Sequence, residues 1–461
     1  MQTKHLLLLI IYLITSILIF IYVDLDYLGK VSIIIFLLSL GLFIFSKVPA
    51  GLVGMLVLMG GILLGLPESI LFESLNQHIV WLMIGAFIIS GIIEESGLLQ
   101  RFVKLINRKC ESIQKLTLFT FIKIQCLSLI IPSTSSRAMA MLPIYRAMTV
   151  KFPSQKLFLG LLIPTLILIA SNLSLIGAGS HLVAIGILEK QTSKTISYLD
   201  FLIWGLPFGI LFGIFATCIL YVLTKENVQR SHDIDIKNEA EVNFKVPFSQ
   251  KEKTTIICVV ITLLLWVLEP LHGLDIAFTT ILMALIMLLP QLNLLHWKKG
   301  LKHISWSLIF FVTSSSALGE LLVRYNVVTY LQSHIMQFLK SLGQVSELMI
   351  VIVIIVISVF SHLVITSHTT RAVVLIPAFI VFAKLFQLNE VAVVFLALIG
   401  INYCLTFPIS SKAILVFYEE EDKPFEPKHL FKLSCILMPL YCLFMLGMYF
   451  TFWKFIGLEL M

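Results

Sequence analysis

Long apolar segments separated by short polar ones occupy most of the chain. About 20 consecutive apolar residues are needed to cross the hydrocarbon core of a bilayer. The pattern predicts about 11 transmembrane helices, near residues 5–23, 31–47, 50–67, 79–97, 157–189, 200–223, 254–270, 275–291, 306–324, 390–418 and 430–453. Two further apolar pairs, 116–131 with 138–150 and 346–365 with 371–384, each enclose a polar motif and predict two re-entrant hairpins.

Composition supports a membrane protein. Hydrophobic residues make up 59% of the chain and charged residues 13%, and the mean hydropathy is +1.00. Soluble domains carry roughly 25% charged residues, so the predicted fold is an all-α polytopic membrane protein. The short alternating segments of a β-barrel are not seen in the sequence. The net charge of +7 is typical of a membrane protein with basic cytoplasmic loops. The expected partner is therefore the lipid bilayer, and no nucleic acid is expected to bind.

The segment 225–253 is the longest hydrophilic stretch and divides the chain. We interpret residues 1–30 as an N-terminal transmembrane helix, 31–224 as a first repeat, 225–253 as a cytoplasmic linker and 254–461 as a second repeat. Each repeat holds five predicted spans, and an odd number inverts the second copy in the membrane. Basic segments of membrane proteins usually face the cytoplasm. This rule predicts a multi-pass protein of the cell membrane whose N-terminus is cytoplasmic, together with the basic segments 100–115, 225–253 and 298–302. Inverted repeats are typical of secondary transporters.

One polar template occurs in both predicted hairpins. Residues 132–143 are PSTSSRAMAMLP and residues 366–377 are TSHTTRAVVLIP. Their first serines are separated by 367 − 133 = 234 positions, and the two arginines keep this offset. Small hydroxyls can cap the helix that follows, and its start presents free N–H groups with partial positive charge. The predicted substrate-binding residues are Ser133, Thr134, Ser135, Arg137, Ser367, His368, Thr369 and Arg371, with Ser136 and Thr370 beside them.

Arg137 and Arg371 stand inside apolar segments, where a charged side chain is costly and usually marks function. A guanidinium can bind a carboxylate or sulfate through two parallel hydrogen bonds. Alternatively, each arginine is structural and pairs with a helix end or a buried acid. A single Ser/Thr cluster can serve helix packing, but the duplicated template favours a binding site.

A second pair of interruptions lies at corresponding places in the two repeats. The sequence LIGAGSHL interrupts the predicted span 157–189 at 175–182, and TFPISSKA interrupts 390–418 at 406–413. Paired breaks of this kind point to a binding site at the membrane midplane. The predicted lining residues are Gly177, Gly179, His181, Pro408, Ser410 and Lys412, preceded by Asn172 and Asn402. The glycines can instead serve packing, and Lys412 can instead anchor the cytoplasmic side near the acidic segment 419–422.

At these motifs the chain resembles the divalent anion/sodium symporter family of the ion transporter superfamily. That family carries Ser-Asn-Thr at the tip of each of two hairpins; the matching triplets are 133–135 and 367–369. Both asparagines are replaced, by Thr134 and His368, which weakens the expectation of Na⁺ as coupling ion. The arginine two places after each triplet resembles the citrate, tartrate and plastid dicarboxylate exchangers. The resemblance implies a homodimer in which the hairpins and broken spans move against a scaffold, 31–67 and 254–291, by an elevator mechanism.

The predicted function is secondary active transport of small di- or trivalent anions, namely dicarboxylates, citrate or sulfate. Coupling is expected through Na⁺ or, preferably, through anion exchange or protons, and no cofactor besides Na⁺ is expected. An arsenite/antimonite efflux protein or a sodium/proton antiporter of the same superfamily is the alternative, although two arginines disfavour a cation substrate. An intramembrane enzyme needs paired acids, an HExxH motif or a Ser/His/Asp set. HExxH is lacking and intramembrane acids are few, so we expect neither catalysis nor a metal site.

Overall fold

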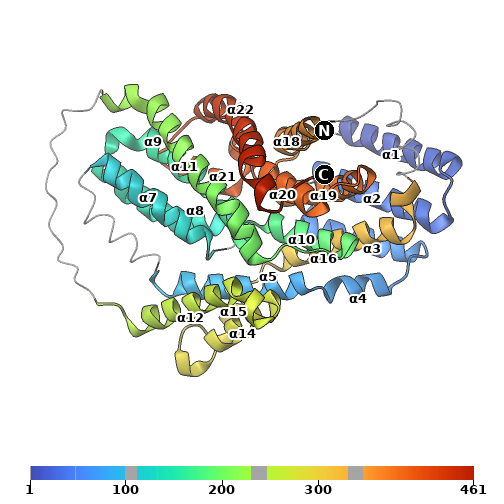
Figure 1. Cartoon of the computed structure of the whole chain (residues 1–461), viewed down its shortest axis with the longest axis horizontal. Coiled ribbons are helices and arrows are strands. Elements are labelled where there is room, and N and C mark those ends of the chain that lie inside the picture. Colours follow the sequence, from blue (N-terminus) through green and yellow to red (C-terminus); the bar gives the residue numbers. More distant parts are fainter. Residues whose placement is uncertain (1, 47, 99–111, 132, 230–246, 331–345) are drawn as a thin grey trace.

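Helices form nearly all of the regular structure in the computed structural model, which describes residues 2–46, 48–98, 112–131, 133–229, 247–330 and 346–461 (Figure 1). No strand occurs in these ranges. The first half contains α1 (Gln2–Tyr22), α2 (Tyr27–Phe45), α3 (Ala50–Leu63), α4 (Ser69–Leu75), α5 (His78–Glu95), α7 (Ile113–Ser128), α8 (Thr134–Lys151), α9 (Lys156–Ala170), α10 (Gly179–Thr192) and α11 (Tyr198–Gln229). The 3-10 turns η1 (Pro153–Gln155), η2 (Ser171–Leu173) and η3 (Leu175–Gly177) lie between them.

The second half passes through the same order of elements. It contains α12 (Gln250–Val267), α13 (Glu269–His272), α14 (Ile276–Met287), α15 (Trp297–Lys302), α16 (Trp306–Arg324), α18 (Glu347–Phe360), α19 (His368–Leu385), α20 (Glu390–Ile401), α21 (Lys412–Tyr418) and α22 (Pro427–Thr451). The turns η4 (Pro290–Leu292), η5 (Ser361–Leu363), η6 (Pro408–Ser410) and η7 (Trp453–Ile456) complete it. The pairs α7–α8 and α18–α19 are the two hairpins, and α9–α10 and α20–α21 are the two broken spans.

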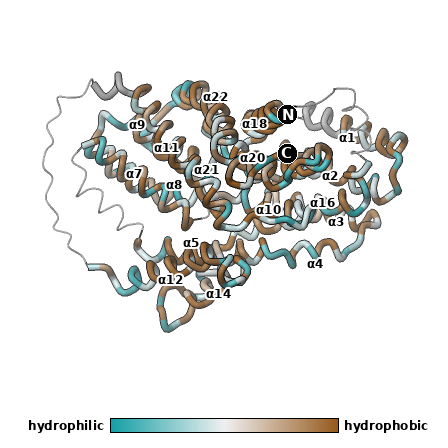
Figure 2. The backbone as a smooth tube through the Cα atoms, viewed as in Figure 1, coloured by the Kyte–Doolittle hydropathy of each residue, from teal (hydrophilic) through white to brown (hydrophobic). Residues whose placement is uncertain are grey.

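The helices consist mainly of apolar residues, and several of them start at a polar residue that caps the first turn. Figure 2 shows long hydrophobic stretches in many of the helices, with hydrophilic residues between them. Side-chain oxygens accept backbone N–H groups at many helix starts, which satisfies donors that have no partner inside the helix; the capping residues include Asp26, Ser112, Ser249, Asp275, Ser346 and Asn389. Among the described residues, seven helices are long and apolar enough to cross a membrane, and shorter apolar helices accompany them. Two of the shorter ones, Glu347–Leu363 and Glu390–Ile401, belong to the second hairpin and the second broken span.

Helices of the first half pack against helices of the second half. Helix α3 packs on α16 and α5 packs on α14, while α8 packs on α21 and α10 packs on α19. We call α2–α5 with α12–α16 the flanking unit, and α7–α11 with α18–α22 the hairpin unit. The largest apolar core runs through the hairpin unit and onto α5, α12 and α14, and a smaller one joins α2, α3 and α16. Because each hairpin is packed on the other half's broken span, the hairpin unit is held together as one body.

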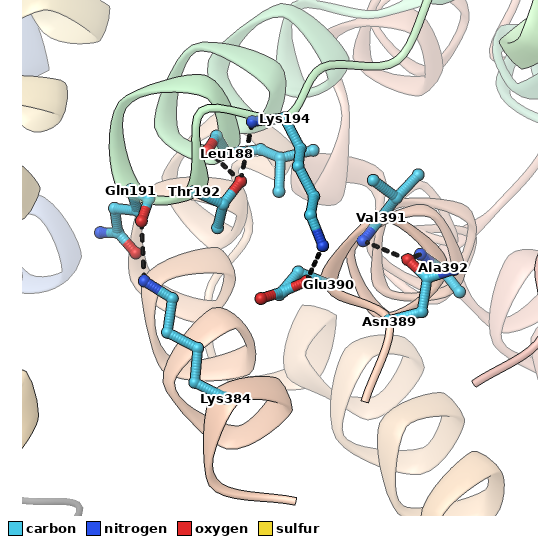
Figure 3. A network of polar contacts seen from close by, with 9 residues as sticks. All are labelled: Leu188, Gln191, Thr192, Lys194, Lys384, Asn389, Glu390, Val391 and Ala392. Carbon is cyan, nitrogen blue, oxygen red and sulfur yellow. Dashed lines mark hydrogen bonds and ion pairs between the residues drawn. The ribbon is translucent and has the colours of Figure 1, made fainter. Parts of the chain in front are cut away.

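Ion pairs and hydrogen bonds tie the hairpin unit at the ends of its helices. At the end of α8, the Arg146 guanidinium donates twice to the Glu420 carboxylate, at 2.9 and 2.8 Å. In the last turn of α19, the Lys384 ammonium donates to the backbone carbonyl of Gln191 at 2.7 Å. Lys194 lies 2.6 Å from the Glu390 carboxylate in the same network (Figure 3). All three contacts join the first half to the second, and exposed pairs of this kind each contribute about 0–1 kcal/mol.

Two predicted segments differ in extent or lie outside the described ranges. Helix α11 continues to Gln229 and α12 begins at Gln250, so the segment between them is shorter than the predicted linker 225–253. Most of that linker, and most of the basic segment 100–115, lies outside the described residues.

Candidate functional site

The two hairpin tips have the same local structure. Ser133 is the N-cap of α8, and its Oγ accepts from the Ser136 N–H at 3.2 Å and lies 2.8 Å from the Ser135 hydroxyl. Ser367 caps α19 in the same way, with Thr370 N–H at 3.3 Å and the Thr369 hydroxyl at 2.9 Å. The predicted capping role of the template serines is therefore seen in both repeats. Each tip presents hydroxyl groups beside the partial positive charge of a helix start.

Both tips open into one cavity of about 620 Å³ between the hairpin unit and the flanking unit. Its hairpin-unit wall contains most of the predicted site residues: Ser133, Thr134, Ser135, Ser136, Gly179, Ser367, His368, Thr369, Thr370, Ser410 and Lys412. Thus residues 234 positions apart in sequence are brought to a common space, as the paired motifs predict. Hydroxyl groups, helix starts and one ammonium make this wall suited to an anion.

The flanking unit supplies wall residues that the motifs do not indicate. They come from the start of α3, the last turns of α5 and the start of α16: Ala50, Gly51, Phe87, Ser90, Gly91, Glu94, His303, Ser305, Ser307, Leu308 and Phe311. The His303 Nδ1 lies 4.0 Å from the Glu94 carboxylate. In the sequence Glu94 resembles the polar end of a span, because nothing local indicates that α5 will face the hairpin tips.

Arg137 and Arg371 lie behind the tips and do not line the cavity. Both side chains are completely buried. The Arg137 guanidinium donates to the Gly177 carbonyl, and the Arg371 guanidinium donates to the Tyr403 carbonyl at 2.9 Å. Within the described residues, Nε and one Nη of each guanidinium have no hydrogen-bond partner. Contrary to the expected direct contact with substrate, this geometry matches the alternative in which each arginine binds a helix end.

His181 also lies in the core, where it joins the two chain breaks. Its Nδ1 contacts the carbonyl of Ser174 at 3.0 Å, and carbonyls only accept, so Nδ1 carries the proton. Its Nε2 then accepts from the Asn402 amide at 2.5 Å. The same amide donates to the Asn172 side-chain oxygen at 2.7 Å, and the Asn402 oxygen accepts from Ser180 at 2.9 Å. Asn172 and Asn402 thus bond to each other where the broken spans cross.

Gly177 and Pro408 shape the breaks and are not among the residues lining the cavity. A Cβ on Gly177 would lie 2.2 Å from the Ser171 carbonyl oxygen, so the turn requires glycine. Pro408 is the first residue of the turn η6, where a missing N–H costs nothing. Sequence reasoning therefore found the breaks, while its assignment of these two residues, of His181 and of the arginines to the cavity wall differs from the structure.

No group of three or more His, Cys, Asp or Glu side chains that could hold a metal occurs in the described part of the chain. The tip hydroxyls are oxygen ligands of the kind that Na⁺ takes. Ser133 is paired with Ser135 and Ser367 with Thr369 by one hydrogen bond each, which leaves lone pairs on the oxygens and one O–H of each pair.

Comparison with known proteins agrees with this architecture. The family model described as the sodium:sulfate symporter transmembrane region matches residues 2–458. A citrate/succinate antiporter of Escherichia coli K12 is 23% identical over 356 residues, which cover 73% of this chain and 71% of the relative. A membrane protein of Cupriavidus necator is 23% identical over 351 residues, 73% of this chain and 67% of that protein. An L-tartrate/succinate antiporter of Shigella sonnei is 23% identical over 265 residues, 54% and 53% of the two chains.

A solved structure shares the fold. The crystal structure of the Alcanivorax borkumensis YdaH transporter superposes with a TM-score of 0.59 at 12% identity, covering 93% of this chain and 99% of that one. Apolar helices, paired hairpins and this likeness define the fold of a polytopic membrane protein. The chain belongs to the sodium:sulfate symporter transmembrane family and transports anions. The predicted family and fold class are thereby confirmed.

Proposed function

We propose that this protein exchanges small di- and tricarboxylates across the cell membrane, binding them between the two hairpin tips. The observation that carries the proposal is the meeting of two identically capped tips, with Ser133 and Ser367 at their N-caps, at one cavity. Helix starts and hydroxyls donate hydrogen bonds to carboxylate oxygens. The citrate/succinate and tartrate/succinate antiporters among the relatives support carboxylates as substrates.

Exchange is preferred over sodium coupling because positive charge is built into the protein. Arg137 and Arg371 are buried directly behind the tips, and their charge supplies a favourable potential to an anion in the cavity without touching it. Thr134 and His368 stand where the resembled sodium-coupled family has asparagines. A fixed cation cannot be released on one side of the membrane, so the empty carrier returns slowly and exchange is favoured.

The proposed movement is an elevator displacement of the hairpin unit against the flanking unit. The cavity lies between these two units, and the cross-half contacts at Arg146, Lys194 and Lys384 hold the hairpin unit together as it moves. With the N-terminus in the cytoplasm, the start of α16 and the end of α5 lie on the cytoplasmic side. The cavity then faces the cytoplasm in this structure.

Two further assignments belong to the same proposal. The protein is placed in the cell membrane and is a homodimer, as the resemblance implies. Exposed apolar residues on the flanking unit, such as Leu52, Leu56 and Leu271, are compatible with lipid or with a second copy. Light scattering of the detergent-solubilised protein gives the mass and tests the dimer; a monomeric mass would contradict it.

The deciding experiment is uptake of labelled succinate, citrate and sulfate by proteoliposomes. The lumen is either empty or preloaded with unlabelled succinate, each with and without an inward Na⁺ gradient. We expect uptake of succinate and citrate that requires preloading and ignores Na⁺. Na⁺-driven uptake into empty liposomes would replace exchange by symport. Uptake of none of these anions under any condition would overturn the proposed substrates.

A further inference from the structure

The two repeats contribute different groups to the cavity. The hairpin tips share their serine N-caps and small hydroxyls and differ in kind at Thr134 against His368, while the second halves of the broken spans differ at their first residue. Helix α10 begins at Gly179, whereas α21 begins at Lys412, and both residues line the cavity. At the start of these two helices, the first repeat therefore presents a neutral glycine to the cavity and the second presents a primary ammonium.

The ammonium of Lys412 is free to meet a ligand. The residue is exposed to the cavity, and within the described residues its side chain makes no hydrogen bond or ion pair. By contrast, Lys190 and Lys194 on the first half each lie within 3.0 and 2.6 Å of a carboxylate. An unpaired charge in the interior of a membrane protein is expensive, so it usually marks a ligand or ion path.

The remaining charges around the cavity define what Lys412 adds. Of the described lysines and arginines, Lys412 is the one that lines the cavity; the titratable residues opposite it are Glu94 and His303 on the flanking unit, with His368 at a tip. The tips offer neutral donors that any carboxylate can use. Among the lysines and arginines that the structure describes, a second negative charge on the ligand therefore gains a direct ion pair from Lys412 alone.

We propose that Lys412 pairs with a carboxylate of the bound anion and thereby selects di- and tricarboxylates over monocarboxylates. The inference rests on the proposed function, because it assigns a specificity role within the same site. A lysine is a point charge on a flexible stem, so its binding energy depends more on the charge of the ligand than on its shape, and it can reach carboxylates of ligands of different length. Succinate and butyrate, which share four carbons and differ by one carboxylate, separate these two properties.

The test compares succinate exchange in wild type, Lys412→Met, Lys412→Arg and Lys428→Met, with butyrate as inhibitor. Methionine keeps the length of the stem and removes the charge, and arginine keeps the charge. Lys428 is 70% exposed at the start of α22 and controls for the loss of one positive charge elsewhere. We expect Lys412→Met to raise the KM for succinate about tenfold or more, with little change in the inhibition constant of butyrate. Lys412→Arg should keep the preference for succinate over butyrate, and Lys428→Met should stay near wild type.

Separate outcomes distinguish the two proposals. If wild type does not exchange succinate, the proposed function fails. If wild type exchanges succinate but Lys412→Met keeps the wild-type preference for succinate over butyrate, the role of Lys412 is overturned while the proposed function stands. If Lys412→Met loses exchange completely, succinate- and butyrate-induced rises in its thermal unfolding midpoint provide the same comparison. Retained stabilisation by succinate far above that by butyrate would again contradict the role of Lys412.

Discussion

Arg137 and Arg371 lie one helical turn behind the hairpin tips, with their guanidinium groups completely buried. Each donates to a carbonyl in the break of its own repeat, where an interrupted helix leaves acceptors without partners. Each also retains nitrogens with no hydrogen bond within the described residues. A single side chain therefore holds the break in shape and places a positive charge behind the anion site.

Substitution of Arg137 separates these two tasks. Arg137→Gln removes the charge and leaves the Gly177 carbonyl poorly paired, which should cost about 1–3 kcal/mol of stability and abolish succinate exchange. Arg137→Lys keeps the charge with fewer donors, so part of the exchange rate should remain. Exchange in proteoliposomes and thermal unfolding of the purified variants measure both effects. Full exchange by the glutamine variant would contradict a role for the charge.

At the scale of elements, helix starts and chain breaks organise the site. Helices α8 and α19 start directly after Ser133 and Ser367, and those N-caps turn the hydroxyls into the cavity. Arg137 and Arg371 follow four residues later, buried behind the tips, and their guanidinium groups donate to carbonyls in the breaks. The capping hydroxyls can therefore meet a ligand directly, whereas the arginines act from behind them.

A pair of isosteric substitutions tests the tip without removing its cap. Asparagine and aspartate are both good N-caps, so Ser133→Asn and Ser133→Asp should unfold at similar temperatures. Only aspartate adds a negative charge where a carboxylate is expected to bind. We expect Ser133→Asp to raise the KM for succinate at least tenfold above that of Ser133→Asn, because like charges repel strongly in a cavity of low dielectric constant. Equal KM values would exclude this tip from the anion site.

Much of this organisation was predictable because it depends on short local motifs in the sequence. The 234-residue offset between Ser133 and Ser367 indicated two hairpins, and glycine and proline indicated the breaks. The burial of the arginines and of His181 was not predictable, since it depends on how the hairpins and broken spans pack together in three dimensions. The wall formed by Glu94 and His303 was missed for a similar reason: α5 and α16 carry no motif, and only tertiary packing brings them to the tips.

At the scale of the whole molecule, the flanking helix α16 contacts the hairpin unit at both of its ends. Ser307 near its start lines the cavity, while Glu320 near its other end lies 3.0 Å from Lys190 on α10. These positions are 320 − 307 = 13 residues apart, or roughly 20 Å along the helix. The cavity thus opens at one end of α16, and an ion pair joins the two units at the other end.

An elevator displacement of the hairpin unit must break the Lys190–Glu320 pair, so the pair should stabilise the state with the present cavity. In Lys190→Glu, lost attraction and new repulsion together should shift the equilibrium between states by roughly 1 kcal/mol, about fivefold. The double variant Lys190→Glu/Glu320→Lys restores an ion pair and should restore the equilibrium.

Ile409, which is 68% exposed and lines the cavity, provides the reporter as Ile409→Cys, in a chain whose other reactive cysteines are replaced. An impermeant thiol reagent applied from the cytoplasmic side should label it several-fold more slowly in Lys190→Glu and at the original rate in the double variant. Equal labelling in all three chains would mean that the two units do not separate at this contact, and the elevator displacement would lose its support.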